Sequence, residues 1–523
     1  MGKKMTVILM VLVLVLGGLA CSAAGKEEME SQEQDSDEKI LQELDGKRFG
    51  VQTGSTFDKD VLSWFPNAQL FYYNSLPDMV VALETGKIDA FPSDAIALEM
   101  MSNQNASESI RVLTPFMDEY SCGFVFDKTP EGGKLRDSFD EWMSSVEASG
   151  QLDQMKDKWL HAAEEDKTMP DYKALSADNG TLIFATEAGF PPFDYLRSGE
   201  VVGYEVEMAI EFCKAYGYGI EIVPMSFEGI LPAVQSGKVD FSASGFAITE
   251  ERKESINFSK PYYTGGTKIV VPSTVSSDNK SFNKSFIART VESFEKTFLR
   301  EDRWKLFVEG SFNTLVITVF SILFGTLLGF VVYLLCRSRG AVFNNVISWF
   351  TWLLQGMPVV VLLMILYYII FGKTSLEGMV ISIIGFTLVF GVAVLGILKT
   401  GVSAVDGGQT EAASALGCTP RQAFFHIIFP QALPFMTDPY KGEIIGLVKA
   451  TSIVGYIAVL DLTKMGDLVR SRTYEAFFPL IAVMIIYFIL EGILGFCVSI
   501  IAKKIDPRKK NNGKLLKGVD RHD

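Results

Sequence analysis

Five apolar stretches in the second half of the chain constrain its fold more than any other feature. Each is close to the roughly 20 residues that an α-helix needs to cross the hydrocarbon core of a bilayer. They run approximately over Leu315–Leu335, Val346–Phe371, Gly378–Leu398, Ile444–Leu462 and Phe477–Ile501. The sequence therefore predicts an all-α transmembrane bundle of five helices within residues 305–505.

Basic residues that flank these stretches predict the orientation of the bundle. Lys and Arg gather in the cytoplasmic loops of membrane proteins. This rule places the loop with Arg337 and Arg339, the segment with Arg421 and the basic tail 506–523 on the cytoplasmic side. An odd number of spans then puts residues 22–304 outside. We therefore expect a multi-pass protein of the bacterial cell membrane with an extracytoplasmic front half.

The amino terminus has the form of a secretory signal over residues 1–21. Lys3 and Lys4 precede an apolar run, and small residues precede Cys21. Cys21 resembles the cleavage site of bacterial lipoproteins, which implies its lipidation; an uncleaved signal anchor is the alternative. Residues 22–44 are acidic and polar, which predicts a disordered tether.

Composition argues against several classes of function. The net charge of −14 belongs mostly to the front half and argues against nucleic acid as a partner. With 3 histidines and no CxxC pair, we expect no metal site. The chain has no Gly-x-x-x-x-Gly-Lys-Ser/Thr phosphate loop and no grouping of nucleophile, base and oxyanion site. We therefore expect neither ATP hydrolysis nor another enzymatic activity.

A polar segment, Gly408–Pro434, interrupts the apolar half. On its own it predicts an amphipathic surface helix that is capped by Gly and broken by Pro. Its Glu411-Ala412-Ala413, followed by Gly417, Ile427 and Pro430, resembles the cytoplasmic coupling loop of ABC-importer permeases. The resemblance implies that Glu411, Ala412, Ala413 and Gly417 dock the chain onto a separate ABC ATP-binding subunit. That ATPase subunit would hold ATP-Mg, and this chain would bind no cofactor.

The same half resembles the polar amino acid permeases over nearly its whole length. The motifs that carry the resemblance are Gln355-Gly356-Met357-Pro358, Lys399-Thr400-Gly401, Gly408-Gln409 and Lys449-Ala450-Thr451-Ser452. It implies a type I permease subunit that forms a homodimer through its transmembrane domain. Gln355 and Lys399 stand where the family usually has Arg, so we transfer no substrate contact inside the membrane.

Three ionisable residues lie in or beside the predicted spans: Glu443, Lys449 and Glu491. Because charges in lipid are costly, each is expected to face the bundle interior, a partner subunit or water. A transport pathway is one interpretation for Glu443 and Lys449. Helix-end charges that reach the interface are the other.

The front half contains an internal echo. Residues 82–90, ALETGKIDA, recur as residues 233–241, AVQSGKVDF. Each copy predicts a helix end, a glycine with positive φ and a short buried strand. Asp94 and Gly245 each stand five residues beyond the echoed aspartate, at the carboxyl ends of equivalent strands, where open α/β sheets bind ligands. The echo therefore predicts two α/β lobes that face each other across a cleft.

Motifs of the front half resemble the amino-acid-binding receptors of bacterial uptake systems, which have a two-lobed, type II periplasmic-binding-protein-like α/β fold. Residues 179–273 match the first lobe, with FPPF at 190–193, GYEVE at 203–207, ITEER at 248–252 and FSKPYY at 258–263. Residues 45–165 match the second lobe and the return segment, with GKR at 46–48, GST at 54–56 and KW at 158–159.

The second lobe precedes the first here, which reverses the order of that family. We interpret the reversal as a circular permutation in which residues 166–178 join the old termini. Permutation is physically easy where termini are exposed and adjacent. Two truncated receptors in tandem are the alternative. Residues 274–304 are the expected linker into the first span.

A free amino acid presents a carboxylate and an ammonium, so its receptor needs a cation and an anion on facing walls. The resemblance assigns the carboxylate to Arg252, whose planar fork can donate two parallel hydrogen bonds, and the ammonium to Asp94. Ser55 and Thr56 would add hydroxyl and backbone donors. Gly245 would offer a backbone group.

Two further residues are assigned to the ligand by the same resemblance. Phe190 would stack on it, and Glu187 would meet its side chain. Structural alternatives exist: core packing for Phe190, a solvated carboxylate for Glu187, an N-cap for Asp94 and a surface ion pair with Glu250 or Glu254 for Arg252.

Together these features predict the receptor–permease subunit of a polar amino acid ABC importer. A ligand-gated channel is the alternative from another class, and it predicts a re-entrant selectivity segment without a coupling loop. A membrane-bound sensor is the third interpretation and would need an output domain, for which the basic tail is too short.

Overall fold

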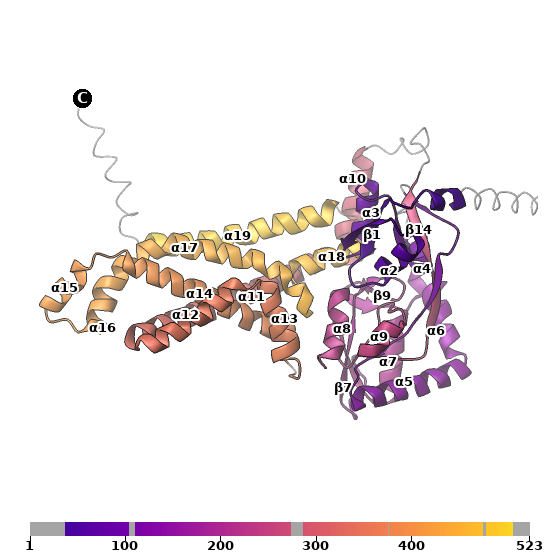
Figure 1. The fold of residues 1–523 in the computed structure, drawn as a ribbon, viewed down its shortest axis with the longest axis horizontal. Coiled ribbons are helices and arrows are strands. Elements are labelled where there is room, and N and C mark those ends of the chain that lie inside the picture. The colour runs from indigo at the N-terminus through magenta and orange to yellow at the C-terminus, as the bar shows by residue number, and fades with distance from the viewer. Residues whose placement is uncertain (1–36, 104–109, 274–285, 375, 474–476, 506–523) are drawn as a thin grey trace, which may run out of the picture. The chain divides into compact units, whose positions relative to one another are not determined.

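The structure is a computed structural model that describes residues 37–103, 110–273, 286–374, 376–473 and 477–505. The predicted signal, Cys21, most of the tether, part of the linker 274–304 and the basic tail lie outside these residues. The described chain divides into two compact units; Figure 1 labels their helices and strands. The smaller unit comprises residues 37–123, 245–249 and 260–273, and the larger unit comprises residues 124–244, 250–259 and 286–505.

The smaller unit is an α/β lobe with two sheets. β1 and β2 pair in parallel, whereas β14 pairs antiparallel with β3, β4 and β5. The strands are β1 (Arg48–Gln52), β2 (Gln69–Tyr73), β3 (Phe91–Asp94), β4 (Ile110–Val112), β5 (Asp118–Cys122) and β14 (Tyr263–Pro272). The helices are α2 (Phe57–Trp64), α3 (Leu76–Glu84) and α4 (Ala95–Asn103).

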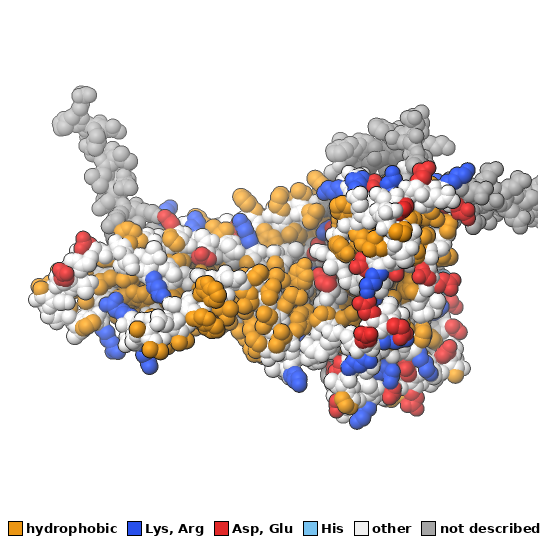
Figure 2. Space-filling model, viewed as in Figure 1, with side chains coloured by type: hydrophobic (Ala, Val, Ile, Leu, Met, Phe, Trp, Pro, Cys, Tyr) orange, Lys and Arg blue, Asp and Glu red, His pale blue; other side chains and the backbone are white. Residues whose placement is uncertain are grey.

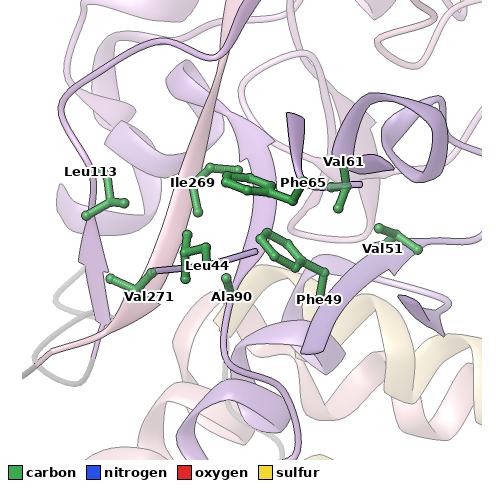
Figure 3. Close-up of a cluster of buried hydrophobic side chains, with 9 residues drawn as sticks. All are labelled: Leu44, Phe49, Val51, Val61, Phe65, Ala90, Leu113, Ile269 and Val271. Carbon is green, nitrogen blue, oxygen red and sulfur yellow. The ribbon is translucent and has the colours of Figure 1, made fainter. Parts of the chain in front are cut away.

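An apolar core joins the two sheets of the smaller unit (Figure 3). Phe49 of β1 stacks on Phe65, with ring centroids 5.0 Å apart. The buried members are Leu44, Phe49, Val51, Val61, Phe65, Ala90, Leu113, Ile269 and Val271. Burial of each large apolar side chain contributes roughly 1.5–3 kcal/mol. Ile269 and Val271 thereby fix β14 in a lobe whose other strands come from much earlier in the chain.

The α/β part of the larger unit, residues 124–244 and 250–259, is built on a five-stranded sheet of order β11-β7-β12-β6-β13. β7 pairs in parallel with β11 and β12, and β6 is antiparallel to its neighbours. These strands are β6 (Val125–Phe126), β7 (Thr181–Thr186), β11 (Gly219–Pro224), β12 (Phe241–Ser242) and β13 (Asn257–Phe258). A separate antiparallel sheet holds β8 (Gly189–Phe190), β9 (Asp194–Arg197) and β10 (Glu200–Val202).

Helices and buried aromatic side chains complete this α/β part. Its helices are α5 (Pro130–Ala148), α6 (Gln151–Leu160), the short turn η1 (Glu164–Asp166), α7 (Tyr204–Ala215), α8 (Phe227–Gln235) and α9 (Glu250–Ser255). Phe139 of α5 packs on Phe124 and Phe212, with ring centroids 4.5 and 5.0 Å apart. This contact attaches the helices of the first sequence block to those of the second.

The echoed segments fold alike, one in each unit. α3 and α8 are each followed by a left-handed glycine, Gly86 with φ +68° and Gly237 with φ +69°. The strands β3 and β12 then follow. The predicted sequence of helix end, positive-φ glycine and strand is therefore confirmed in both copies.

Each unit takes strands from both blocks of sequence. β14, from the block 179–273, is the central strand of the smaller unit, and β6, from the block 45–165, lies inside the sheet of the larger unit. Helices α5 and α6 of the first block also belong to the larger unit. The two blocks therefore complete each other's sheets, and the compact units do not coincide with them.

Residues 286–505 are helical. The segment before the bundle contains α10 (Phe286–Phe294), the π-turn η2 (Glu295–Leu299) and η3 (Arg300–Asp302). The helical bundle, residues 304–505, contains α11 (Trp304–Ser338), α12 (Ala341–Gly356), α13 (Val359–Met364), η4 (Ile365–Ile370), α14 (Gly378–Ser403), α15 (Gly408–Ala415), α16 (Pro420–Gln422), η5 (Ala423–Ile428), α17 (Phe429–Ala450), η6 (Thr451–Ile457), α18 (Leu462–Thr473) and α19 (Phe477–Ile505).

The described part of the bundle has 3 helices long and apolar enough to span a membrane, or up to 5 if each of 2 bent pairs is one span. Figure 2 shows hydrophobic side chains over the bundle, whereas charged side chains crowd the α/β parts. Close packing of α11 on α14 depends on glycine: a Cβ at Gly329 would lie 2.6 Å from the Gly391 carbonyl oxygen. Small residues of this kind let helices associate in lipid.

The second predicted span, Val346–Phe371, is bent in the structure. α12 ends at Gly356, α13 begins at Val359, and the two are bent by 107°. Pro358 lacks an amide hydrogen and disfavours helical backbone at the residue before it. Met357 is accordingly extended, with φ −101° and ψ 132°.

The fourth predicted span, Ile444–Leu462, is wrong in its bounds. α17 begins much earlier, at Phe429, and is continued by η6, which ends at Ile457; the next residue, Ala458, has φ +59°. α18 then begins at a bend of 56°. Asp461 caps α18 by accepting hydrogen bonds from the amides of Thr463 (3.0 Å) and Lys464 (3.1 Å).

Candidate functional site

In the smaller unit, Ser55 and Thr56 follow the carboxyl end of β1. Gly54, with φ +83°, turns the chain there. The Ser55 hydroxyl donates to the Gln52 carbonyl (2.7 Å) and accepts from the Phe57 amide (3.3 Å). Thr56 is the N-cap residue of α2, and its side chain makes no capping hydrogen bond. The turn therefore presents the Thr56 side chain at the start of a helix, where the dipole favours a negative group.

Asp94 ends β3, the strand beside β1, and is 2% exposed. Its Oδ1 accepts a hydrogen bond from the Ile96 amide (3.1 Å), which is the geometry of a helix N-cap, and its Oδ2 accepts one from the Tyr120 hydroxyl. Burial raises the pKa of Asp94 to about 6, although both hydrogen bonds lower it. A buried carboxylate of this kind gains stability from a cationic partner.

Gly245 lies in a short segment, residues 245–249, that returns to the smaller unit. Its φ of +63° belongs to the left-handed region that favours glycine. The Ile248 amide donates to the Ser121 carbonyl (2.8 Å), and Ala247 bridges to Cys122. Four of the predicted ligand residues, Ser55, Thr56, Asp94 and Gly245, thus belong to one unit.

In the larger unit, Glu187 follows β7 and Phe190 lies in β8. The Glu187 amide donates to the Ser244 hydroxyl (3.3 Å), which joins the carboxyl ends of β7 and β12. Phe190 is half-buried and stacks on Phe193, with ring centroids 5.3 Å apart. One face of Phe190 is therefore supported by packing, as a stacking platform requires.

Asp194 links residues at the carboxyl ends of β7 and β12 by hydrogen bonds. It was not identified as a site residue from the sequence. The buried carboxylate accepts hydrogen bonds from the hydroxyls of Thr186 and Ser244, both at 2.6 Å, and from the Phe190 amide at 3.2 Å. Burial, and then the nearby Glu205, raise the pKa of Asp194. The available signal was an acidic residue directly after the apolar FPPF motif.

Arg252, the predicted carboxylate ligand, lies in α9 of the larger unit and is half-buried. The Glu250 carboxylate on the same helix pairs with Lys253 at 2.7 Å. Arg252 and Asp94 therefore belong to different units.

The predicted coupling segment forms a helix and a tight turn at the end of the bundle remote from α13 and α18 (Figure 1). α15 ends in a turn in which the Gly417 amide donates to the Ser414 carbonyl (3.0 Å), and Gly417 has φ +81°. Thr419 and Gln422 then form a capping box for the next helix. Sequence and structure agree on a rigid, glycine-ended helix here.

The faces of α15 divide the predicted coupling residues. Glu411, Ala412 and Gly417 are exposed, whereas Ala413 is 1% exposed and packs against the bundle. Leu416 is 82% exposed, which is unusual for a large apolar side chain. The exposed side of α15 and Leu416 can contact another protein, and Ala413 holds the helix in place.

An open pocket of about 450 Å³ lies on the bundle. Its lining includes Gln355, Thr400, Phe435, Pro439 and Glu443, so polar groups from three helices reach it. Glu443 is exposed at this pocket, which is compatible with either interpretation of its charge. Lys449 lies instead at 3.6 Å from Glu491, so these two charges of α17 and α19 partly neutralise each other.

Comparison with known proteins assigns relatives to both halves of the chain. Residues 182–520 match the profile of the bacterial extracellular solute-binding proteins, family 3. The putative glutamine transport system permease protein GlnP of Rickettsia bellii (strain RML369-C) is 31% identical over 203 residues, which cover 38% of this chain and 92% of that protein. The arginine transport system permease protein ArtQ of Bacillus subtilis (strain 168) is 32% identical over 210 residues, which cover 39% of this chain and 93% of that protein.

A solved structure is also similar. The crystal structure of an amino acid ABC transporter with histidines shares 26% sequence identity, over 42% of this chain and 98% of that chain, with a TM-score of 0.37.

Proposed function

Because this chain belongs to the family-3 bacterial extracellular solute-binding proteins and to the amino acid ABC transporter permeases, we propose that it is the receptor and the permease of one importer. It captures a polar amino acid outside the cell and passes it to its own helical bundle. The observation that carries this proposal is the presence in one chain of a solute-binding region and a bundle that matches 92% of a curated permease.

The receptor part is one circularly permuted receptor. The exchange of strands β6 and β14 between sequence blocks supports this, because two truncated receptors would each lack strands that the other supplies. Arg252 binds the carboxylate of the amino acid, Asp94 binds its ammonium, and Ser55, Thr56 and Gly245 add hydrogen bonds. Phe190 stacks on the ligand, and Glu187 meets its side chain.

A basic or amide side chain suits this arrangement. The raised pKa of Asp94 supports its assignment, because an ammonium beside it would offset the cost of its burial. The names of the relatives point to glutamine and arginine, two ligands whose side chains carry N–H donors. Glu187 would accept from such donors.

The bundle works with a separate ATPase and with a second copy of the chain. The ATPase docks on α15, with Leu416 as the apolar anchor and Glu411, Ala412 and Gly417 around it. The α/β parts lie outside the cell and the coupling segment inside, which the flanking Lys and Arg residues support. The 107° bend at Pro358 could suggest the re-entrant segment of a channel. The sequence at the bend is Gln-Gly-Met-Pro, which does not resemble a selectivity filter, so the bend does not favour the channel interpretation.

Co-purification and uptake test this function. Affinity-tagged chain should retain an ATPase that carries a Gly-x-x-x-x-Gly-Lys-Ser/Thr loop, and the pair in proteoliposomes should take up labelled glutamine or arginine only with ATP. Leu416→Asp should lose the ATPase because it places a charge in an apolar contact. Leu62→Asp, at an exposed apolar site in α2 outside the bundle, should not. Retention of the ATPase by the Leu416 variant would contradict the docking site.

A further inference from the structure

The α/β part of the larger unit contacts the helical bundle at two separate places. Both lie within the larger unit, and they join segments that are far apart in sequence. At the first, the loop that starts β8 touches α18: a Cβ at Gly189 would lie 3.4 Å from the Cβ of Ser471. At the second, the first turn of α8 and the residues that follow α8 touch η4 and the loop after it.

Arg472 of α18 is the centre of the first contact. Its Nη2 lies 3.0 Å from Glu164 of η1 and 3.3 Å from Glu301 of η3, and its guanidinium lies 4.8 Å above the Tyr195 ring. The Tyr195 hydroxyl donates to the same Glu164 oxygen at 2.8 Å. The Arg472 side chain is only 8% exposed. One residue thus ties η1, the β9 strand and the linker before the bundle to α18.

The linker is held in an uncommon backbone conformation at this contact. Glu301 and Asp302 have φ of +55° and +54°, a left-handed region that costs a non-glycine residue roughly 1–2 kcal/mol. Burial alone would raise the pKa of Glu301, but Arg472 and Arg303 outweigh it, so this pKa is lowered. Ion pairs with Arg303 (3.2 Å) and Arg472 therefore keep Glu301 charged and in place.

Lys238 is the centre of the second contact. Its ammonium donates to the carbonyls of Thr374 (3.0 Å) and Leu376 and lies 4.9 Å from the Tyr367 ring centroid. Beside it, the Tyr368 hydroxyl donates to the Tyr456 carbonyl at 2.8 Å, and its oxygen lies 3.2 Å from the Gly229 carbonyl oxygen. Lys87 occupies the same position in the other copy of the echo and is exposed. The burial of Lys238 is therefore a property of this contact and not of the repeated motif.

We propose that these two contacts form a joint that stays closed throughout transport, so that the α/β part of the larger unit never leaves the bundle. This inference rests on the proposed function. The contacts are several, come from separate segments and are held at high effective concentration within one chain, so they must break together for the joint to open. Capture of an amino acid would then depend on movement of the smaller unit alone.

A disulfide across the first contact tests the joint directly. Gly189→Cys combined with Ser471→Cys places two Cβ atoms near the roughly 3.8 Å typical of disulfides. We expect the disulfide to form equally fast in the full chain in membranes, with and without a millimolar mixture of the common L-amino acids. Peptide mapping by mass spectrometry distinguishes it from bonds to native cysteines. A clear slowing by the amino acids would overturn the proposal.

Uptake by the same variant gives a second readout. With its ATPase present, the oxidised double variant should take up labelled glutamine or arginine as fast as the same variant after reduction by dithiothreitol. Loss of uptake on oxidation, with recovery on reduction, would show that the joint must open and would overturn the proposal. Absence of uptake by the unmodified chain would instead count against the proposed function, and the cross-linking rate would still test the joint.

Substitutions at the two centres identify the residues that hold the joint. Arg472→Ala and Lys238→Ala, each added to the cysteine pair, should slow disulfide formation by about tenfold or more, because each removes one of two linked contacts. Lys87→Ala is the matched control and should leave the rate unchanged. Equal rates in the Lys238 and Lys87 variants, both folded, would exclude Lys238 from the joint.

Discussion

At the scale of single residues, Asp94 affects both the stability of the smaller unit and the proposed binding of an amino acid. In the unfolded chain its carboxyl ionises at its ordinary pKa of 3.8, whereas burial raises the folded pKa to about 6. A raised folded pKa favours the folded state below pH 3.8, and this advantage is lost as the pH rises through 6. Above pH 6 the buried charge therefore costs roughly 3 kcal/mol, at about 1.4 kcal/mol per pKa unit.

Asp94→Asn should accordingly stabilise the smaller unit while removing its amino acid binding. Hydrogen exchange of the α4 amides in the full chain should report a free energy of opening higher by up to about 3 kcal/mol at pH 7.5. The difference should vanish near pH 3, where the carboxyl of the parent is largely protonated in both states. A destabilised variant at pH 7.5 would mean that the cap and the Tyr120 hydrogen bond outweigh the cost of burial.

Arg252 is the second residue whose role can be isolated. Its removal should weaken amino acid binding by about 100-fold or more, because a charged, bidentate hydrogen bond is lost. Arg252→Lys should recover only part of the affinity, since an ammonium cannot reproduce the planar fork. Lys253→Ala is the control on the same helix, because Lys253 pairs with Glu250 instead. Isothermal titration calorimetry of the full chain measures all three, and unchanged affinity in Arg252→Ala would reject the assignment.

At the scale of elements, α15 depends on the turn that ends it. Gly417 has φ +81°, and alanine in that region costs about 1 kcal/mol or more. Gly417→Ala should therefore reorient the turn, reduce uptake and leave amino acid binding intact. Gly407→Ala, at the other end of α15 with φ −59°, should be tolerated. Loss of both uptake and binding in the Gly417 variant would contradict a role confined to coupling.

The helices, strands and turns also differ in how far they could be predicted from the sequence. The echo identified a helix, a left-handed glycine and a strand twice, because glycine and strand residues leave a local signal. Pro358 gives a local signal for a bend, but the apolar content of residues 346–371 alone predicts one span. The break at Ala458 had no such signal, since a left-handed alanine is imposed by the surrounding structure. Asp194 was missed because only the folded edge brings Thr186, Ser244 and Phe190 to it.

At the scale of the whole molecule, the two compact units do not coincide with the two sequence blocks. The blocks 45–165 and 179–273 could be matched to two lobes by motif, but motifs do not reveal that β6 and β14 cross over. Pairing between strands so far apart in sequence is decided by tertiary packing such as that of Ile269 and Val271. The roles of the ligand residues and of the ATPase contact remain predictions.

Direct titration of the purified full chain with the common L-amino acids tests the central claim, that one chain carries both an amino acid receptor and its permease. Calorimetry should detect one saturable site for at least one polar amino acid, and the heat should disappear in Arg252→Ala and Asp94→Asn while Lys253→Ala retains it. If hydrogen exchange shows that the chain is folded and no amino acid binds, the result would contradict the account.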